Sequence, residues 1–360
     1  MNCSNLVSAG GYLFDRLIGD VEGLTFRDVR TAPFQIHGLY RPKTEPVFHR
    51  LPDDVARATS EGVAGLQYNT AGGRVRFRTD SQRVAIAAVL PKQTLFPHMT
   101  LLGASGFDLY EKVNGRARYV HSFKPATDRF DAACGVCGFP TKQMREFTLN
   151  FPLYNGVNAL QIGLDADARL EAPAPYAVEP PVVFYGSSIT QGACAARPGT
   201  CCEAWVSRAI GCDYINLGFA GNAKGEPAIV NYMAGLEMSA FVCDYDHNAP
   251  DPAHLRATHA PLYRAIRAAH PDIPFIMLTK PDYKIGDPDF DERRAVVMET
   301  FQMAQASGDR NVYFIDGATL FGGAGRGDCT ADGCHPTDLG FYRMAEKIIP
   351  VLRAALGKKA

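Results

Sequence analysis

A short apolar run, Val182–Tyr185, lies between a Pro-Pro pair and Gly186, and two serines follow it. Four apolar residues bounded by chain-breaking residues are typical of a strand buried on both faces, as in a parallel sheet. Four further runs of this kind follow: Asp213–Leu217, Ala240–Asp244, Pro274–Thr279 and Val312–Asp316. Windows with helical spacing lie between the later runs, over Pro261–His270 and Asp291–Ser307, and a last helix is expected from about Thr337. Strands that alternate with helices predict a parallel sheet covered by helices on both faces.

The first half of the chain has a different pattern, in which apolar and polar residues alternate. Asn-Gly turn signals at Asn114-Gly115 and Asn155-Gly156 separate some of these segments. The alternating segments are Gly73–Asp80, Arg83–Leu90, Ala117–Phe123, Glu146–Pro152 and Asn158–Leu164. Several short strands at such spacing predict an antiparallel β-sandwich or jelly roll without long helices.

A Pro-rich stretch, Ala172–Pro181, lies between the two patterns and is read as an extended linker. A chain of 360 residues is too long for one typical domain and fits two. We therefore expect a β-sandwich domain over residues 1–175 and an α/β domain over residues 176–360.

Composition narrows the class of protein. The net charge of −1 gives no indication of a nucleic-acid or anionic-membrane partner, and no apolar run is long enough to span a bilayer. The segment Met1–Asp20 shows no secretion signal. The 10 cysteines are too sparse in a chain of this length for a disulfide scaffold. These observations predict a cytoplasmic protein with reduced thiols.

Four loops that follow predicted strands, or precede the last helix, carry polar residues: Gly186–Thr190, Asn216–Asn222, Asp244–Pro250 and Asp332–Pro336. Because parallel strands end at one edge of their sheet, these loops can converge there. A serine needs a base to become a nucleophile, and the base needs an orienting group. Asp332 and His335 supply such a pair. Gly221 can offer a backbone N–H and Asn248 a side-chain amide to an oxyanion.

Two alternatives remain open at this point. Ser187 stands beside Ser188 and could be the nucleophile instead. Asp332 and His335 could also bind zinc, for which His247 is the nearest candidate third ligand by loop position.

The four blocks resemble those of the SGNH (GDSL-type) hydrolases, which share a flavodoxin-like three-layer fold. The resemblance implies that Ser188 is the nucleophile, His335 the base and Asp332 its orienting group. It also implies that the oxyanion donors are the Ser188 and Gly221 backbone N–H groups and the Asn248 side chain. Two positions depart from the family pattern, because Ser187 replaces the usual Asp and the third block lacks Gly-x-Asn-Asp.

The segment Gly106–Tyr110 resembles the Gly-x-Asp-Leu-Tyr motif of a β-sandwich domain that precedes one branch of these hydrolases. That branch includes carbohydrate-acetyl esterases and an acyltransferase of natural-product assembly. We therefore expect a serine esterase that removes acetyl groups from a small molecule or oligosaccharide and needs no metal or cofactor. An acyltransferase with the same residues and a non-catalytic carbohydrate-binding protein are the alternatives. Nothing in the sequence indicates the oligomeric state.

Three further expectations concern the substrate. Glu226 and Arg197 are candidates for binding the alcohol portion, although Glu226 could instead cap a helix and Arg197 could be a solvated loop residue. Phe219, Tyr245 and Cys334 are candidates for lining an acyl pocket. The loops around the proposed site carry small, polar and charged residues and no apolar helix that could act as a lid, which predicts a short acyl group.

Overall fold

The computed structural model describes residues 7–9, 12–14, 21–91, 95–126, 131–282 and 286–357. The expectation that Met1–Asp20 carries no secretion signal therefore concerns a segment that lies mostly outside the described residues. By its internal contacts the chain divides into two compact units. The first comprises residues 1–50, 68–175 and 196–199, and the second comprises residues 51–67, 176–195 and 200–360.

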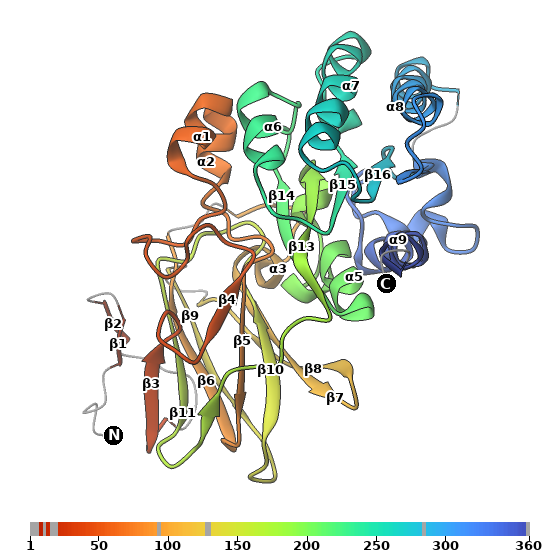
Figure 1. Cartoon of the computed structure of the whole chain (residues 1–360). Helices are drawn as coiled ribbons and strands as arrows, with labels where there is room; N and C mark the ends of the chain where they lie inside the picture. The colour runs from red at the N-terminus through yellow and green to blue at the C-terminus, as the bar shows by residue number, and fades with distance from the viewer. Residues whose placement is uncertain are drawn as a thin grey trace. The chain divides into compact units, whose positions relative to one another are not determined.

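The first unit is an antiparallel β-sandwich (Figure 1). One sheet has the strand order β12-β5-β10-β7-β8, with β4 paired to β5, and the other has the order β3-β11-β6-β9. The strands are β3 (Leu24–Asp28), β4 (Gln35–His37), β5 (Arg74–Thr79), β6 (Arg83–Val89), β7 (Phe107–Val113), β8 (Arg116–Phe123), β9 (Ala132–Gly138), β10 (Arg145–Asn150), β11 (Ala159–Asp165) and β12 (Leu170–Glu171), and a separate pair is formed by β1 (Val7–Ala9) and β2 (Tyr12–Phe14).

The alternation in the sequence explains the core of this sandwich. On β5, Val75 and Phe77 point inward and are fully buried, and they lie opposite Leu149 and Phe147 of β10. Side chains from both sheets meet in one hydrophobic core. Residues of the other parity form ion pairs, as between Arg76 and Glu146 at 3.0 Å. The predicted sandwich is confirmed, and its five predicted strands correspond to β5, β6, β8, β10 and β11.

Short helices within the first half of the chain were not predicted. They are α1 (Asp53–Thr59), α2 (Glu61–Leu66) and α3 (Leu101–Ser105). Helices of this length contain fewer than two turns, so they leave no periodic pattern in the sequence. Helices α1 and α2 belong to the second unit, where Leu51, Ala56 and Val63 join the hydrophobic core.

The second unit contains a five-stranded parallel sheet with the order β14-β13-β15-β16-β17. Its strands are β13 (Val178–Gly186), β14 (Cys212–Gly218), β15 (Ala240–Asp244), β16 (Phe275–Leu278) and β17 (Val312–Ile315). Its longer helices are α5 (Cys202–Ile210), α6 (Pro227–Ala234), α7 (Pro252–Ala269), α8 (Pro288–Ala306) and α9 (Asp338–Gly357). None of the described helices is long and apolar enough to cross a membrane.

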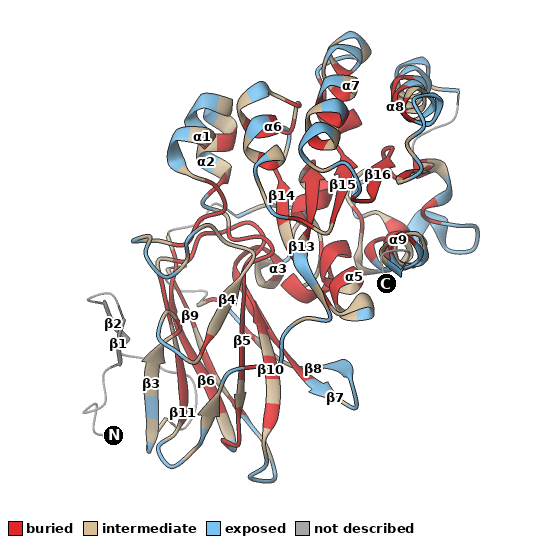
Figure 2. Cartoon of the chain, viewed as in Figure 1, coloured by how far each residue is buried: buried red, intermediate tan, exposed pale blue. Residues whose placement is uncertain are grey.

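Helices cover both faces of this sheet, with α5 and α9 on one face and α6, α7 and α8 on the other (Figure 1). The strands between them are buried along most of their length (Figure 2). Numbered from β13, the strand order is 2-1-3-4-5, which is the flavodoxin-like order. The predicted three-layer α/β fold is confirmed, and all five predicted strands are present.

Two details differ from the sequence-based expectations. The linker expected over Ala172–Pro181 is part of the sheet from Val178 onward, because β13 pairs with β14 at Val178 and again from Val182. The register shifts between these two positions, where Pro180 and Pro181 have no N–H to donate. The helix expected from Pro261 begins at Pro252, where Asp251 caps it by accepting the His254 N–H at 2.7 Å.

Gly186, at the end of β13, lies at a close crossing of the chain with its neighbours. A Cβ atom at this position would overlap the Asp244 carbonyl oxygen and the Thr190 hydroxyl. Gly218, at the end of β14, is equally restricted, because a Cβ atom there would overlap the backbone of Thr190 and Gln191. Because neither glycine has a side chain, the turn that follows β13 can pack closely against the ends of the neighbouring strands.

We predict that Gly186→Ala destabilises the fold by about 1–3 kcal/mol or more, because overpacking in a rigid crossing forces the backbone to move. Thermal or denaturant unfolding of the full chain would measure this. Gly65→Ala is the matched control, because Gly65 lies in α2 with open space around its Cα. Alanine is favoured over glycine in a helix by about 1 kcal/mol, so this variant should be neutral or stabilised. Equal unfolding midpoints for both variants would contradict the crossing argument.

Candidate active site

The turn after β13 distinguishes the two adjacent serines. Ser187 is fully buried and caps the four-residue helix α4 (Ser188–Gln191), because its Oγ accepts the Ile189 N–H at 3.0 Å. Ser188 is the first residue of this helix and is partly exposed. The structure therefore engages Ser187 in backbone capping and leaves Ser188 accessible at the carboxyl edge of the sheet.

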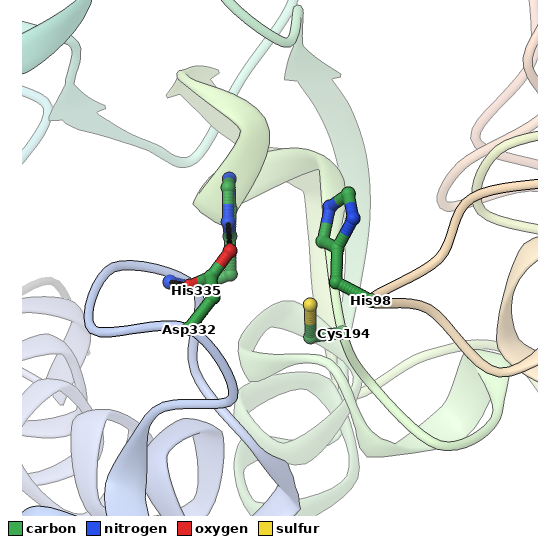
Figure 3. A group of neighbouring side chains, drawn as sticks. All are labelled: His98, Cys194, Asp332 and His335. Atoms are coloured by element: carbon green, nitrogen blue, oxygen red, sulfur yellow. Dashed lines mark hydrogen bonds and ion pairs between the residues drawn. The ribbon is translucent and has the colours of Figure 1, made fainter.

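Ser188, His335 and Asp332 form a hydrogen-bonded chain. The Ser188 Oγ lies 2.9 Å from His335 Nε2, and His335 Nδ1 lies 2.7 Å from Asp332 Oδ2. Asp332 and His335 come from the loop before α9, and their side chains point toward each other (Figure 3). A carboxylate beside Nδ1 places the imidazole hydrogen on that nitrogen, so Nε2 presents its lone pair to the Ser188 hydroxyl.

Asp332 is well suited to hold the histidine in this tautomer. Burial alone would raise the pKa of its carboxyl group. Hydrogen bonds from the His335 ring and from the backbone N–H groups of His335 and Cys334 outweigh that effect and lower the pKa to about 2. Asp332 is therefore ionised throughout the pH range in which an esterase works.

The second and third loops are tied to this turn by backbone hydrogen bonds. Phe219 donates its N–H to the Gly186 carbonyl at 2.9 Å, and Ser187 donates its N–H to the Asp244 carbonyl at 3.1 Å. Gly221 is exposed and has a φ of +68°, a backbone conformation that favours glycine. The Asn248 Nδ2 donates to the Phe219 carbonyl at 3.1 Å. The roles of Ser188, Gly221 and Asn248 as oxyanion donors stay predictions.

Four buried polar residues that the sequence analysis did not single out hold these loops together. Asn216 donates to the Thr190 carbonyl at 2.6 Å and accepts the Gly218 N–H at 2.9 Å. Gln191 accepts the Ala220 N–H at 3.1 Å, and Thr190 donates to Asp244 Oδ2 at 3.3 Å. For Asn216 and Asp244 the signal in the sequence is a polar residue near the end of an apolar strand, which is costly to bury unless it is hydrogen-bonded. Thr190 and Gln191 lie in helix α4 and carry no such signal.

His247 does not gather with the Asp332–His335 pair as a metal ligand. Among the described residues, its ring lies with two buried carboxylates, 2.9 Å from Asp246 and 3.9 Å from Asp244. Burial raises the pKa of Asp244 to about 6 despite the nearby His247. Asp244 of this cluster contacts Thr190 in the turn that carries Ser188, and His247 is not grouped with Asp332 and His335, so the zinc site considered for these three residues does not form.

Glu226 precedes helix α6 and is half-buried. Its side chain makes no capping bond to the helix, and instead its Oε2 accepts the Lys224 N–H at 3.2 Å. Burial raises the pKa of this carboxyl group. The capping role is therefore not observed, and the substrate-binding role of Glu226 stays a prediction.

Arg197 lies in the segment 196–199, which belongs to the first unit. Its Nη1 contacts Asp108 Oδ2 at 3.1 Å and also donates to the Tyr110 hydroxyl, while its guanidinium lies 4.2 Å from the centre of the Tyr119 ring. Asp108 is fully buried and accepts the Gly199 N–H at 2.8 Å. The Gly-x-Asp-Leu-Tyr motif thus anchors this segment, and Arg197 is not a solvated loop residue. A contact of Arg197 with substrate stays a prediction.

Two of the three residues expected to line an acyl pocket lie elsewhere. Phe219 and Tyr245 are buried in the hydrophobic core of the second unit, with 0% and 1% of their surface exposed. The Tyr245 hydroxyl bonds to Thr258 at 2.9 Å. That part of the prediction was wrong, because the apolar side chains at these strand ends turn into the core. Cys334 is partly exposed in the Asp332–His335 loop.

Comparison with protein-family models agrees with this geometry. Residues 179–353 match the GDSL-like lipase/acylhydrolase family, and residues 24–170 match the GxDLY domain that forms the N-terminus of SGNH-hydrolase-type esterases. The chain therefore belongs to the GDSL-like lipase/acylhydrolase family and carries a GxDLY N-terminal domain. A search of the curated proteins gives no match.

Several solved structures share the fold of both domains. A protein of Bacteroides ovatus described as a GDSL-like lipase is 28% identical, with a TM-score of 0.83 over 93% of this chain and 98% of that chain. The salicylyl-acyltransferase SsfX3 of a tetracycline biosynthetic pathway is 21% identical, with a TM-score of 0.76 over 94% and 99%. The acetyl xylan esterase Est2A of Butyrivibrio proteoclasticus is 13% identical, with a TM-score of 0.60 over 93% and 99%.

We predict that Ser188→Ala and His335→Ala each lower kcat by at least about 10³-fold, because members of a triad act as a unit. Steady-state turnover of an activated acetyl ester would measure this loss, and mass spectrometry should locate a fluorophosphonate label on Ser188. Ser187→Ala is the control and should mainly lose a helix cap of about 1 kcal/mol. A label on Ser187, or an active Ser188→Ala enzyme, would reassign the nucleophile.

For Asn248→Ala we expect kcat to fall by about 10²–10³-fold with little change in KM, because one oxyanion donor is lost. Asn222→Ala is a matched control, because its Nδ2 also donates to a backbone carbonyl of the second loop, that of Ala220 at 2.7 Å. Similar kcat values for the two variants would show that Asn248 only ties the loops together.

Proposed function

We propose that this protein is a serine esterase that removes small acyl groups, in particular acetyl, from hydroxyl groups of carbohydrates. The observation that carries the proposal is the hydrogen-bonded chain Ser188–His335–Asp332 at the carboxyl edge of the parallel sheet. Ligands bind at this edge in open α/β sheets, next to the point where the strand order reverses. Here the order reverses at β13, because β14 lies on one side of it and β15, β16 and β17 lie on the other. Ser188 follows the end of β13 closely.

In the proposed mechanism the Ser188 oxygen attacks the ester carbonyl while its proton moves to His335 Nε2. The ionised Asp332 stabilises the imidazolium that forms. His335 then gives this proton to the sugar oxygen, and the sugar leaves. Water attacks the resulting acyl-enzyme with His335 again as the base, which releases the acid and restores the serine.

The tetrahedral intermediate carries a negative charge that needs preorganised donors. We assign this role to the backbone N–H groups of Ser188 and Gly221 and to the side chain of Asn248. Support for this comes from the loop connections, since Gly221 and Asn248 lie on the two loops that bond to the backbone of β13 and its turn.

Support for a small acyl group and a polar alcohol comes from two sources. The described residues of the loops 193–202, 219–227 and 245–252 form no apolar lid helix, and the aromatic residues Phe219 and Tyr245 are withdrawn into the core. The fold is also shared with an enzyme named as an acetyl xylan esterase, and at 13% sequence identity this likeness concerns the fold alone. Glu226, half-buried beside the second loop, is the proposed partner for a substrate hydroxyl. The cytoplasmic location expected from the sequence stays a prediction.

An acyltransferase is the second candidate, because the acyl-enzyme can be attacked by an alcohol instead of water. The fold of the salicylyl-acyltransferase SsfX3 matches 94% of this chain, and this similarity supports an acyltransferase as the alternative. Product analysis in the presence of candidate sugar acceptors separates the two activities, because only a transferase forms a new ester. A non-catalytic carbohydrate-binding protein is disfavoured, because binding alone has no need for the aligned serine, histidine and aspartate.

We predict that kcat/KM falls steeply from acetyl to butyryl and becomes negligible at octanoyl, measured on one common leaving group. A long acyl chain needs a broad apolar surface, which the loops around Ser188 do not supply. Acetylated oligosaccharides, assayed by acetate release, are the second substrate set and should be hydrolysed. A preference for octanoyl esters would overturn the proposed small-acyl specificity.

A further inference from the structure

A thiol lies beside the proposed triad, on the segment that follows helix α4. The helix ends at Gly192, and Cys194 comes two residues later with a φ of +68°. Such a conformation is uncommon for residues other than glycine. The chain therefore holds a side chain in a backbone conformation that favours glycine. This side chain lies near Asp332 and His335 (Figure 3).

Three metal-binding donor types converge here within the second unit. One ligand atom each from Cys194, Asp332 and His335 lies within 4.8 Å of the others. Thiolate, imidazole and carboxylate are the usual ligands of zinc, and three protein ligands leave a fourth position for water. Cys194 and His335 are partly exposed and Asp332 is exposed, so an ion can reach them from solvent.

A thiol binds a soft divalent cation as the thiolate, because coordination displaces its proton.

We propose that Cys194, Asp332 and His335 form a binding site for zinc, and that zinc bound there reversibly inhibits the enzyme. Binding forms a bond between zinc and the Cys194 sulfur, and the thiol proton is released to solvent. His335 would bind the ion through Nδ1, the nitrogen beside Asp332, and the proton that Nδ1 carried would move to Nε2, so Ser188 loses its base. The inhibitory part rests on the proposed esterase function, whereas the binding part does not.

Other charged clusters of the second unit do not compete with this site. Asp244, Asp246 and His247 also bring donor atoms together, but Asp244 and Asp246 are buried and His247 is only partly exposed. The Asp246 carboxylate already accepts the backbone N–H groups of His247 and Lys280 and lies 2.9 Å from the His247 ring. The Cys194 site differs in that it is open to solvent and includes the proposed catalytic base.

The test uses the full chain after chelator treatment, titrated with zinc chloride. Ester hydrolysis and zinc binding are followed in parallel, the latter by competition with a chromophoric chelator. We expect inhibition that excess chelator reverses. Loss of a residue that only supports a metal ligand costs about 10–100-fold in metal affinity. Loss of a ligand itself should cost at least as much, so Cys194→Ser should raise the half-inhibitory zinc concentration at least about tenfold. Inhibition of each variant is measured relative to its own activity without metal. Cys334→Ser, a neighbouring thiol outside the donor group, should be inhibited like the wild type.

Two further variants keep the result interpretable. Glycine adopts the left-handed backbone of position 194 without strain, so Cys194→Gly should fold. It should lose zinc inhibition to the same extent as Cys194→Ser, so the test does not depend on the folding of a single variant. Ser188→Ala removes the nucleophile but no ligand, and should bind zinc as tightly as the wild type. Zinc binding that depends on Cys194 in a chain without esterase activity would support the site and refute the proposed function. Equal zinc affinity of the wild type and both Cys194 variants would overturn the site.

Discussion

The close crossing of β13 with its two neighbours is the constraint on which the candidate site depends. Gly186 and Gly218 have no room for a Cβ atom, because Asp244, Thr190 and Gln191 occupy that space. The chain can therefore turn from strand to helix within one residue, with Ser187 buried as the cap and Ser188 at the surface. A looser crossing would move the Ser188 oxygen away from His335, which comes from a distant loop.

Buried polar side chains tie together the loops around this crossing. Asn216, Gln191 and Asp244 each bond the turn that carries Ser188 or the loops beside it. Each such bond satisfies a group that would be costly to bury alone, so the loops are held in one arrangement. In the first unit, Asp108 plays the same part for the segment 196–199, which contains Arg197.

The loop of Asp332 and His335 combines two properties that are in tension. Hydrogen bonds keep Asp332 ionised and the imidazole oriented, which a general base requires. The same loop, with the Cys194 thiol nearby, also brings together an imidazole and a carboxylate that can bind a soft cation. Partial exposure, which lets an ester reach Ser188, also lets a metal ion reach this loop.

The sequence by itself determined the two patterns of the chain, the five strands of the parallel sheet, five strands of the sandwich and the order of the four loops. Periodicity and turn residues are local signals, so β15, for example, begins and ends at its predicted residues. Tertiary structure alone decided that Ser187 caps a helix while Ser188 faces His335, and that Phe219 and Tyr245 turn into the core. It also decided that residues 51–67 join the second unit and that Cys194 lies beside the triad. Each of these depends on contacts between residues far apart in the chain, which no local pattern records.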